Sequence, residues 1–221
     1  MVKRIHILVE GPTEETFVDR LIIPHLSRFH IYADATIVCT KRVQGRRAYR
    51  GGGNDYQKMR NDLQILLRND TSATAVTTIF DYYGLPGDFP GYHTRPTMDP
   101  FSKVAYLEEQ MYLDINHTKF IPNLILHEFE ALLFSDHEII AETLEISRRQ
   151  RDKLNTIINS VSSPEEINNS PDTAPSKRLE QIIPGYQKQF HCSIIAPKIG
   201  LGKMREKCTH FNNWMNKLES L

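Results

Sequence analysis

Acidic residues at the ends of apolar runs are the strongest chemical signal in this sequence. Three such runs finish on Glu10, Asp81 and Glu128, and further acids follow at Glu14 and Glu130. Acids gathered at one place repel each other, and their pKa values rise unless a cation balances the charge. A hard divalent ion such as Mg²⁺ or Mn²⁺ prefers oxygen ligands of this kind. The acids therefore predict a metal site.

Each acid also has an ordinary interpretation. A single glutamate after a strand is usually a solvated loop residue. Glu14 and its neighbour Glu15 could serve only as favourable charges in the first turn of a helix. It is the coincidence of several acids at strand ends that favours the metal site.

A basic segment is the second candidate for chemistry. The stretch "KRVQGRRAYRGGGNDYQKMR" contains five arginines, of which four are on a glycine-rich loop: Arg42, Arg46, Arg47 and Arg50. Each guanidinium presents a fixed fork of donors that suits phosphate. A solvated, basic surface loop is the alternative. If the loop lies at the same sheet edge as the acids, it predicts nucleic-acid binding beside the metal site.

The elements that must position these residues alternate along the chain. Apolar, β-branched runs predict strands at 4–9, 35–40, 75–80 and 119–126, the last irregular at Pro122. Helices are expected after an N-terminal cap at Thr13, from Asn54 or Asp55, and over 101–114. Such near-continuously apolar strands favour an α/β fold with a mostly parallel sheet flanked by helices. The carboxyl ends of its strands then meet at one edge, where functional groups collect.

The last part of the chain predicts helices. We expect an α/β core over residues 1–134 and a helical C-terminal region over 135–221 that packs on it. Ser135 and Ser163 each begin a capping-box pattern. Residues 160–176 predict an exposed connection. A final helix over 202–219 carries an apolar stripe that could also contact a partner, including a second copy in a homodimer.

Two basic residues follow Pro175 at an expected helix start. Lys177 or Arg178 could neutralise the charge of a transition-state phosphate. The alternative for both is a position on the helix surface.

The first motif, "ILVEGPTEE", resembles that of TOPRIM domains, especially those of the overcoming-lysogenization-defect nucleases. In that pattern a strand-end glutamate is followed by glycine and by a second acid four residues on, as at Glu10 and Glu14. The pattern continues with Asp-x-Asp on a later strand. Asp81 matches the first of these acids, but Tyr83 stands at the second, where Asp88 could substitute.

Three later segments resemble a family of bacterial TOPRIM-like proteins of unknown function: "LILHEFEALLF", "APSKRLEQIIPGYQK" and "HFNNWMNKLESL". This resemblance covers most of the chain. It implies a TOPRIM-like fold, Mg²⁺-dependent phosphodiester cleavage of nucleic acid, with DNA favoured over RNA, and an AAA or SMC-like ATPase partner in defence against phage or other foreign DNA.

The resemblance also implies roles for individual residues. Glu10 would be a ligand or general acid–base group, and Asp81 the principal ligand. Glu14, together with Glu128 or Glu130, would complete one or two metal sites. Lys177 is a further candidate catalytic residue, on the charge of its side chain rather than on the resemblance. The tyrosine at the second acidic position keeps a competing class open, namely a catalytically degenerate interaction or toxin subunit that binds nucleotide, nucleic acid or a partner protein.

Composition limits where such a protein works. The 27 Lys and Arg residues balance 27 Asp and Glu residues, so the formal net charge is zero and nucleic-acid binding needs a local patch or a partner. The three widely spaced cysteines indicate a reducing compartment rather than a disulfide framework. No apolar run is long enough to span a bilayer. We therefore expect a soluble cytoplasmic protein.

Overall fold

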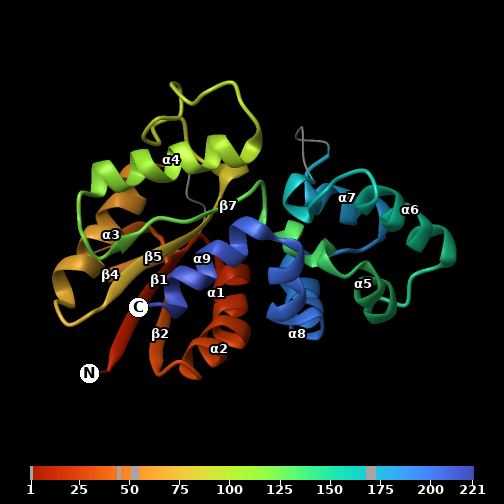
Figure 1. Ribbon diagram of the computed structural model, residues 1–221, viewed down its shortest axis with the longest axis horizontal. Coiled ribbons are helices and arrows are strands. Elements are labelled where there is room, and N and C mark those ends of the chain that lie inside the picture. The colour runs from red at the N-terminus through yellow and green to blue at the C-terminus, as the bar shows by residue number, and fades with distance from the viewer. Residues whose placement is uncertain (1, 44–45, 51–54, 168–172) are drawn as a thin grey trace.

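A parallel sheet lies between helices in the left half of the molecule as seen in Figure 1. The computed structural model describes residues 2–43, 46–50, 55–167 and 173–221, with side chains left out over 40–50. The strands are β1 (Lys3–Val9), β2 (Ile31–Ile37), β3 (Cys39–Val43), β4 (Arg46–Arg50), β5 (Ala75–Asp81), β6 (Phe120–Ile121) and β7 (Leu124–Ile125). The sheet order is β2-β1-β5-β6, and β7 also pairs with β5. Every pairing in this sheet is parallel, whereas β3 and β4 form a separate antiparallel hairpin.

Helical segments connect and cover the strands. They are α1 (Pro12–Phe17), the π-helical turn η1 (Val18–Ile22), α2 (Ile23–Ser27), α3 (Tyr56–Asn69), η2 (Tyr82–Gly84), α4 (Pro100–Ile115), η3 (Phe129–Ser135), α5 (His137–Thr143), α6 (Arg148–Ile158), η4 (Pro164–Glu166), α7 (Pro175–Ile182), α8 (Lys188–Lys207) and α9 (Thr209–Glu219). The predicted α/β class, with helices flanking a parallel sheet and a helical C-terminal part, is confirmed.

The two faces of the sheet have different coverings. On one face, α3 and α4 pack over Leu8, Val76 and Phe80. On the other face, α1, α2, α8 and α9 contribute to a second and larger core that contains Ile5 and Ile7. The alternation along β1 follows from the pleat, which sends successive side chains to opposite faces.

The larger core includes residues on both sides of the boundary expected at 134/135. Trp214 on α9 donates its indole N–H to Thr77 Oγ1 on β5, at 2.9 Å. In Figure 1, α9 runs beside the sheet, while α5, α6 and α7 lie farther out to the right. The division into a core over 1–134 and a helical region over 135–221 stays a prediction.

Several expected element boundaries are wrong at the N-terminal half. The second strand begins at Ile31 and ends at Ile37, and the segment after it is a hairpin rather than a plain loop. Gly11, not Thr13, is the N-cap of α1, because Pro12 takes the first helical position. The fourth strand is split into β6 and β7, as the proline between them had suggested.

Other expectations fail in the C-terminal half. Asp136, rather than Ser135, caps α5 by accepting from Ile139 N. The helix expected over 202–219 is two helices, because Cys208 has extended backbone angles and separates α8 from α9. Glu165 is buried, so the segment 160–176 is not wholly an exposed connection. The capping box at Ser163 is confirmed, although it begins only the short η4 turn.

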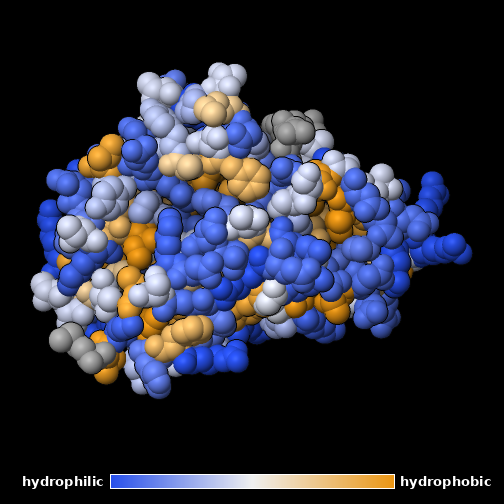
Figure 2. Space-filling model, viewed as in Figure 1, coloured by the Kyte–Doolittle hydropathy of each residue, from blue (hydrophilic) through white to orange (hydrophobic). Residues whose placement is uncertain are grey.

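The surface is mixed in character. On the face shown in Figure 2, hydrophilic residues predominate and hydrophobic ones form scattered groups. Within the described parts of the chain, no helix combines the length and apolar character needed to cross a membrane.

Candidate functional site

Glu10 joins the ends of the two central strands. It follows the last residue of β1, and its Oε1 accepts a hydrogen bond from Asp81 N on β5 at 2.9 Å. Its other oxygen faces Gly84, where an added Cβ would lie 3.8 Å from Oε2. The parallel pairing of β1 with β5 brings these strand ends to one edge of the sheet, as the sequence predicts.

Asp81 links this edge to the segment that follows β7. Its Oδ1 accepts from Phe129 N, the first residue of η3, at 2.9 Å. Glu14 lies in the first turn of α1 and is buried. The turn at Gly11–Pro12 reverses the chain after β1 and so returns Glu14 towards the same edge.

Lys188 lies among these carboxylates. Its Nζ is 2.9 Å from Glu130 Oε2, 3.6 Å from Glu14 Oε1 and 3.6 Å from Asp81 Oδ2. Glu130 is fully buried, and its Oε1 has no hydrogen-bond partner among the described residues. We call Glu10, Glu14, Asp81, Glu130 and Lys188 the carboxylate–lysine cluster.

The ionisation of the cluster reflects a shortage of positive charge. Burial raises the pKa of Glu10 to about 7, against the opposing effect of the Asp81 amide. Burial also raises the pKa of Glu130 to about 7 and that of Asp81 well above its usual range, with Lys188 opposing both shifts. Burial alone would lower the pKa of Lys188, but Asp81, Glu130 and Glu14 raise it overall. One ammonium thus stabilises several buried carboxylates.

The carboxylate oxygens of the cluster are of the kind that a hard divalent ion prefers, and Glu130 Oε1, which has no hydrogen-bond partner among the described residues, could act as a ligand atom. Their positions, however, are not those of a metal site. In the described part of the chain, no set of three or more His, Cys, Asp or Glu side chains is placed to hold a metal ion. The Lys188 ammonium lies between the acids instead, so an incoming ion would have to displace it.

The family model described as "Domain of unknown function (DUF4276)" matches residues 9–219. The chain belongs to the DUF4276 family. This confirms membership in a family of unknown function, as the sequence resemblance implied. No curated protein matches the chain.

Two solved structures are similar to this DUF4276 chain over its length. The C-terminal region of the Burkholderia pseudomallei OLD protein is 15% identical, with a TM-score of 0.49 over 100% of this chain and 98% of that one. The C-terminal region of the Xanthomonas campestris pv. campestris OLD protein is 16% identical, with a TM-score of 0.37 and 97% of each chain covered. Both likenesses are distant, and nothing about activity follows from them.

Two predicted ligands of the DUF4276 chain make other contacts. Glu128 Oε2 accepts from Ser176 N at the start of α7, at 3.0 Å. Asp88 Oδ1 accepts from Tyr56 N at the start of α3, at 3.2 Å. Glu128 acts on the cluster at longer range, where its charge contributes to the raised pKa of Glu130.

The predicted basic residues divide into two groups. Lys177 is exposed and pairs with Glu180 at 2.7 Å, while Arg178 Nε donates to Thr173 O at 2.7 Å. The loop arginines lie on the β3–β4 hairpin, and their side chains fall outside the part that the structure describes: Arg42, Arg46, Arg47 and Arg50.

Lys188 is the residue that sequence reasoning missed. It begins α8 after a turn at Gly185, which has a positive φ of 81°. A lysine in the first turn of a helix is unfavourable with respect to the helix dipole, and this misfit is the signal that could have identified it. The buried acids around it supply the compensating negative charge.

Proposed function

We propose that this DUF4276 chain is a metal-dependent phosphodiesterase of TOPRIM type that acts on nucleic acid. The observation that supports this proposal is the meeting of Glu10, Glu14, Asp81 and Glu130 from separate elements at the carboxyl ends of β1 and β5. Buried carboxylates in such number destabilise a protein unless they serve a cation. Mg²⁺ or Mn²⁺ would be the cation in this proposal, because both prefer carboxylate oxygens as ligands.

In this proposal Glu10, Glu14, Asp81 and Glu130 hold the ion. The bound ion would orient an attacking water and stabilise charge on the leaving oxygen. Glu10 is fixed by the Asp81 amide, so its second oxygen stays directed towards Gly84. Lys188 balances the acids before metal binds and offers a positive charge to a phosphate afterwards.

The wider setting is part of the same proposal. DNA is the favoured substrate, a separate ATPase supplies part of the affinity for it, and the protein works in the cytoplasm in defence against foreign DNA. A formal net charge of zero supports the need for a partner or a local basic surface.

A second candidate function is a non-catalytic TOPRIM-like module that binds nucleotide, nucleic acid or a partner protein. Tyr83 favours it, because this residue stands where the TOPRIM pattern has its second acid and its side chain is exposed. The Lys188 ammonium at the centre of the cluster favours it too, since the acids are already partly neutralised.

Cleavage assays with matched variants test the choice. Plasmid DNA and single-stranded RNA are incubated with the native protein and with Mg²⁺ or Mn²⁺. We expect Glu10→Gln and Asp81→Asn to lower the cleavage rate about a hundredfold or more. Glu142→Gln and Asp152→Asn make the same chemical changes at exposed positions on α5 and α6 and are expected to retain the rate. Equal rates in all four variants, or no metal binding by calorimetry, would support the non-catalytic module.

A further inference from the structure

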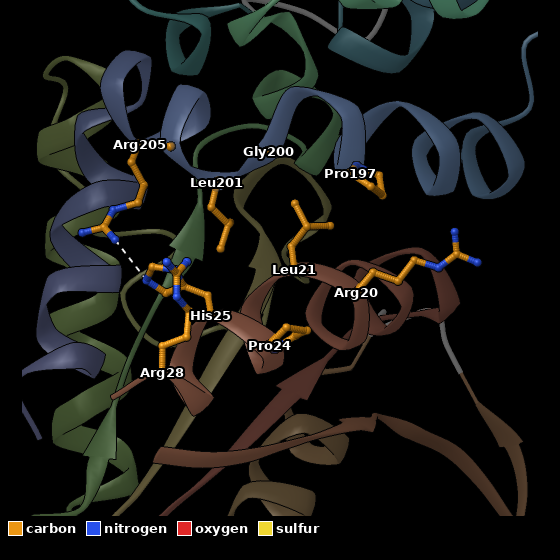
Figure 3. A pocket seen from close by; sticks show the side chains of 10 residues that line it. Arg20, Leu21, Pro24, His25, Arg28, Pro197, Gly200, Leu201 and Arg205 are labelled. Atoms are coloured by element: carbon orange, nitrogen blue, oxygen red, sulfur yellow. Dashed lines mark hydrogen bonds between the residues drawn. The ribbon is translucent and has the colours of Figure 1, made fainter. Parts of the chain in front are cut away.

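A cavity of about 600 Å³ lies between the N-terminal helices and α8 (Figure 3). None of the carboxylate–lysine cluster lines it. Its lining includes three arginines and two glycines: Arg20, Arg28, Arg205, Gly200 and Gly202. We call this cavity the arginine pocket. Its volume lies in the range of pockets that hold small molecules or a few units of a polymer.

The arginine pocket carries unbalanced positive charge. Arg205 is held by Glu219 and by Asn216 Oδ1, the latter at 2.7 Å. Arg20 Nη1 donates only to a neutral carbonyl, Ser193 O, at 2.8 Å. Arg28 is exposed, and no ion pair is found for it within the described residues. Two guanidiniums are therefore available to an anion, and their planar forks suit phosphate.

The shape of the pocket separates its charges. In Figure 3, Arg20 extends at one side, Arg28 and Arg205 lie at the other, and the apolar side chains of Leu21 and Leu201 lie between them. Arg20 and Arg28 are eight residues apart on a helical run, which spans about 12 Å at the ordinary helical rise. The ligand that best complements this lining has at least two anionic groups, with an apolar surface between them.

The glycines leave room in the pocket wall. Gly200 breaks α8 with a φ of 74°, a conformation that favours glycine. A Cβ added at Gly200 or at Gly202 would meet no atom within 4 Å. Both positions therefore face open space, and a side chain at either one would occupy part of it.

Helices α1 and α8 connect the arginine pocket with the cluster. Glu14 and Lys188 pair across these helices at one end, at 3.6 Å. The Arg20–Ser193 hydrogen bond joins the two helical runs farther along. Glu14 and Arg20 are six residues apart, or about 9 Å along a helix. A polymer bound at the cluster would thus need only a short extension to reach the arginine pocket.

We propose that the arginine pocket binds the phosphodiester backbone of a single-stranded nucleic acid next to the carboxylate–lysine cluster. Binding itself needs neither metal nor cleavage, while the role of the strand as substrate rests on the proposed function. Arg20 and Arg28 contact two separate phosphates of the strand, and Arg205, which is held by Glu219, lines the pocket beside them. The apolar side chains between them contact the sugar or base surface.

Fluorescence anisotropy with a 5′-fluorescein-labelled single-stranded oligonucleotide, in EDTA, tests the proposal directly. We expect Arg28→Glu to weaken binding about tenfold and to reduce the slope of log K against log [KCl] by about 0.7 for each phosphate that the protein no longer neutralises. Arg149→Glu makes the same charge change at an exposed position on α6 and is expected to alter binding less than twofold. Equal weakening by the two variants would overturn the proposal.

A second variant tests the shape without changing the charge. Gly202→Leu places a side chain in the open space of the pocket and is expected to weaken oligonucleotide binding while far-UV circular dichroism stays native. Inorganic pyrophosphate at equal phosphate concentration should not displace the strand, whereas unlabelled oligonucleotide should. Displacement by pyrophosphate, or native affinity in Gly202→Leu, would overturn the strand assignment.

The same assay separates this proposal from the nuclease proposal. Glu142→Gln, at an exposed position on α5 outside both the cluster and the arginine pocket, is expected to bind the labelled strand as the native protein does. Loss of cleavage activity in every preparation, with binding that still depends on Arg28, would overturn the nuclease and leave the pocket standing. If Arg28→Glu instead cleaves the strand as the native protein does at every strand concentration and binds it equally well, the arginine-pocket proposal is overturned and the nuclease proposal stands.

Discussion

The Lys188 ammonium lies 2.9 Å from Glu130 Oε2, a carboxylate that no solvent reaches. A buried ion pair of this kind gains Coulomb energy but also removes two charges from water. Here two further carboxylates, those of Asp81 and Glu14, lie 3.6 Å from the same nitrogen and add to the Coulomb energy of the ammonium. Lys188 therefore acts as an internal counter-ion, and under the proposed function a metal ion would replace it there.

Replacing Lys188 should strengthen metal binding. In Lys188→Met no ammonium competes for Glu14, Asp81 and Glu130, so we expect Mn²⁺ to bind about tenfold more tightly, equivalent to about 1.4 kcal/mol. Titration calorimetry measures this affinity without any need for cleavage. Lys198→Met, at an exposed position on the same helix, serves as the control. Equal or weaker Mn²⁺ binding by Lys188→Met would show that lysine and metal do not share a position.

The metal-free stability of the same variant should change in the opposite direction. Without its ammonium, Lys188→Met leaves buried acids uncompensated, which typically costs about 3–5 kcal/mol. Urea denaturation in EDTA should show this loss relative to Lys198→Met, and added Mn²⁺ should restore much of it. A Lys188→Met protein as stable as the control in EDTA would contradict the counter-ion role.

The meeting of Glu10 and Asp81 at one edge of the sheet could be predicted, because it depends on the local pattern of apolar residues and on one rule of sheet topology. Apolar runs ending at Glu10 and Asp81 indicate strands, and parallel strands place their carboxyl ends together. The observed hydrogen bond from Asp81 N to Glu10 agrees with that placement. Glu130 and Glu128 could not be separated from the sequence, because their directions depend on the irregular η3 turn.

Lys188 and the two-helix C-terminus could not be predicted in the same way. The contact of Lys188 with Glu14 joins residues near opposite ends of the chain and depends on how α8 packs beside α1. The end of α8 is set by the extended backbone at Cys208, within a stretch whose apolar spacing also fits one longer helix. In both cases tertiary packing overrides what local periodicity indicates.

Glu165 should be a major determinant of stability in the C-terminal region. Its two carboxylate oxygens accept from His210 N and Phe211 N at the start of α9, at 3.0 and 2.9 Å. No side chain of the N-cap residue performs this role. We expect Glu165→Ala to lower the free energy of unfolding by about 2–3 kcal/mol, because the buried Phe211 amide and the part-buried His210 amide lose their acceptor. Urea denaturation measures the change, and the exposed Glu142→Ala is the control; similar values for the two would contradict the capping role.

The single tryptophan reports whether the C-terminal region folds together with the sheet. Trp214 is buried and donates to Thr77 on β5. If residues 135–221 share one cooperative core with residues 1–134, tryptophan fluorescence and far-UV circular dichroism should give the same urea midpoint. Two separated midpoints would instead indicate that the parts unfold independently. Trp214→Phe, which leaves the Thr77 hydroxyl without its donor, should lower the midpoint in circular dichroism.

His6 should make stability depend on pH. Its Nδ1 lies 2.7 Å from Asp34 Oδ1 and its Nε2 lies 3.0 Å from Asp70 Oδ2, and these carboxylates, Asp34 first, raise its pKa despite partial burial. A raised pKa in the folded protein contributes stability that is full below the unfolded value of about 6.5 and is lost as pH rises through the folded value. The excess stability of the native protein over His6→Gln should therefore be larger at pH 6 than at pH 9, by on the order of 1 kcal/mol. Urea denaturation at the two pH values measures it, with the exposed His93→Gln as control; an excess that does not change with pH would show that protonated His6 does not stabilise the fold.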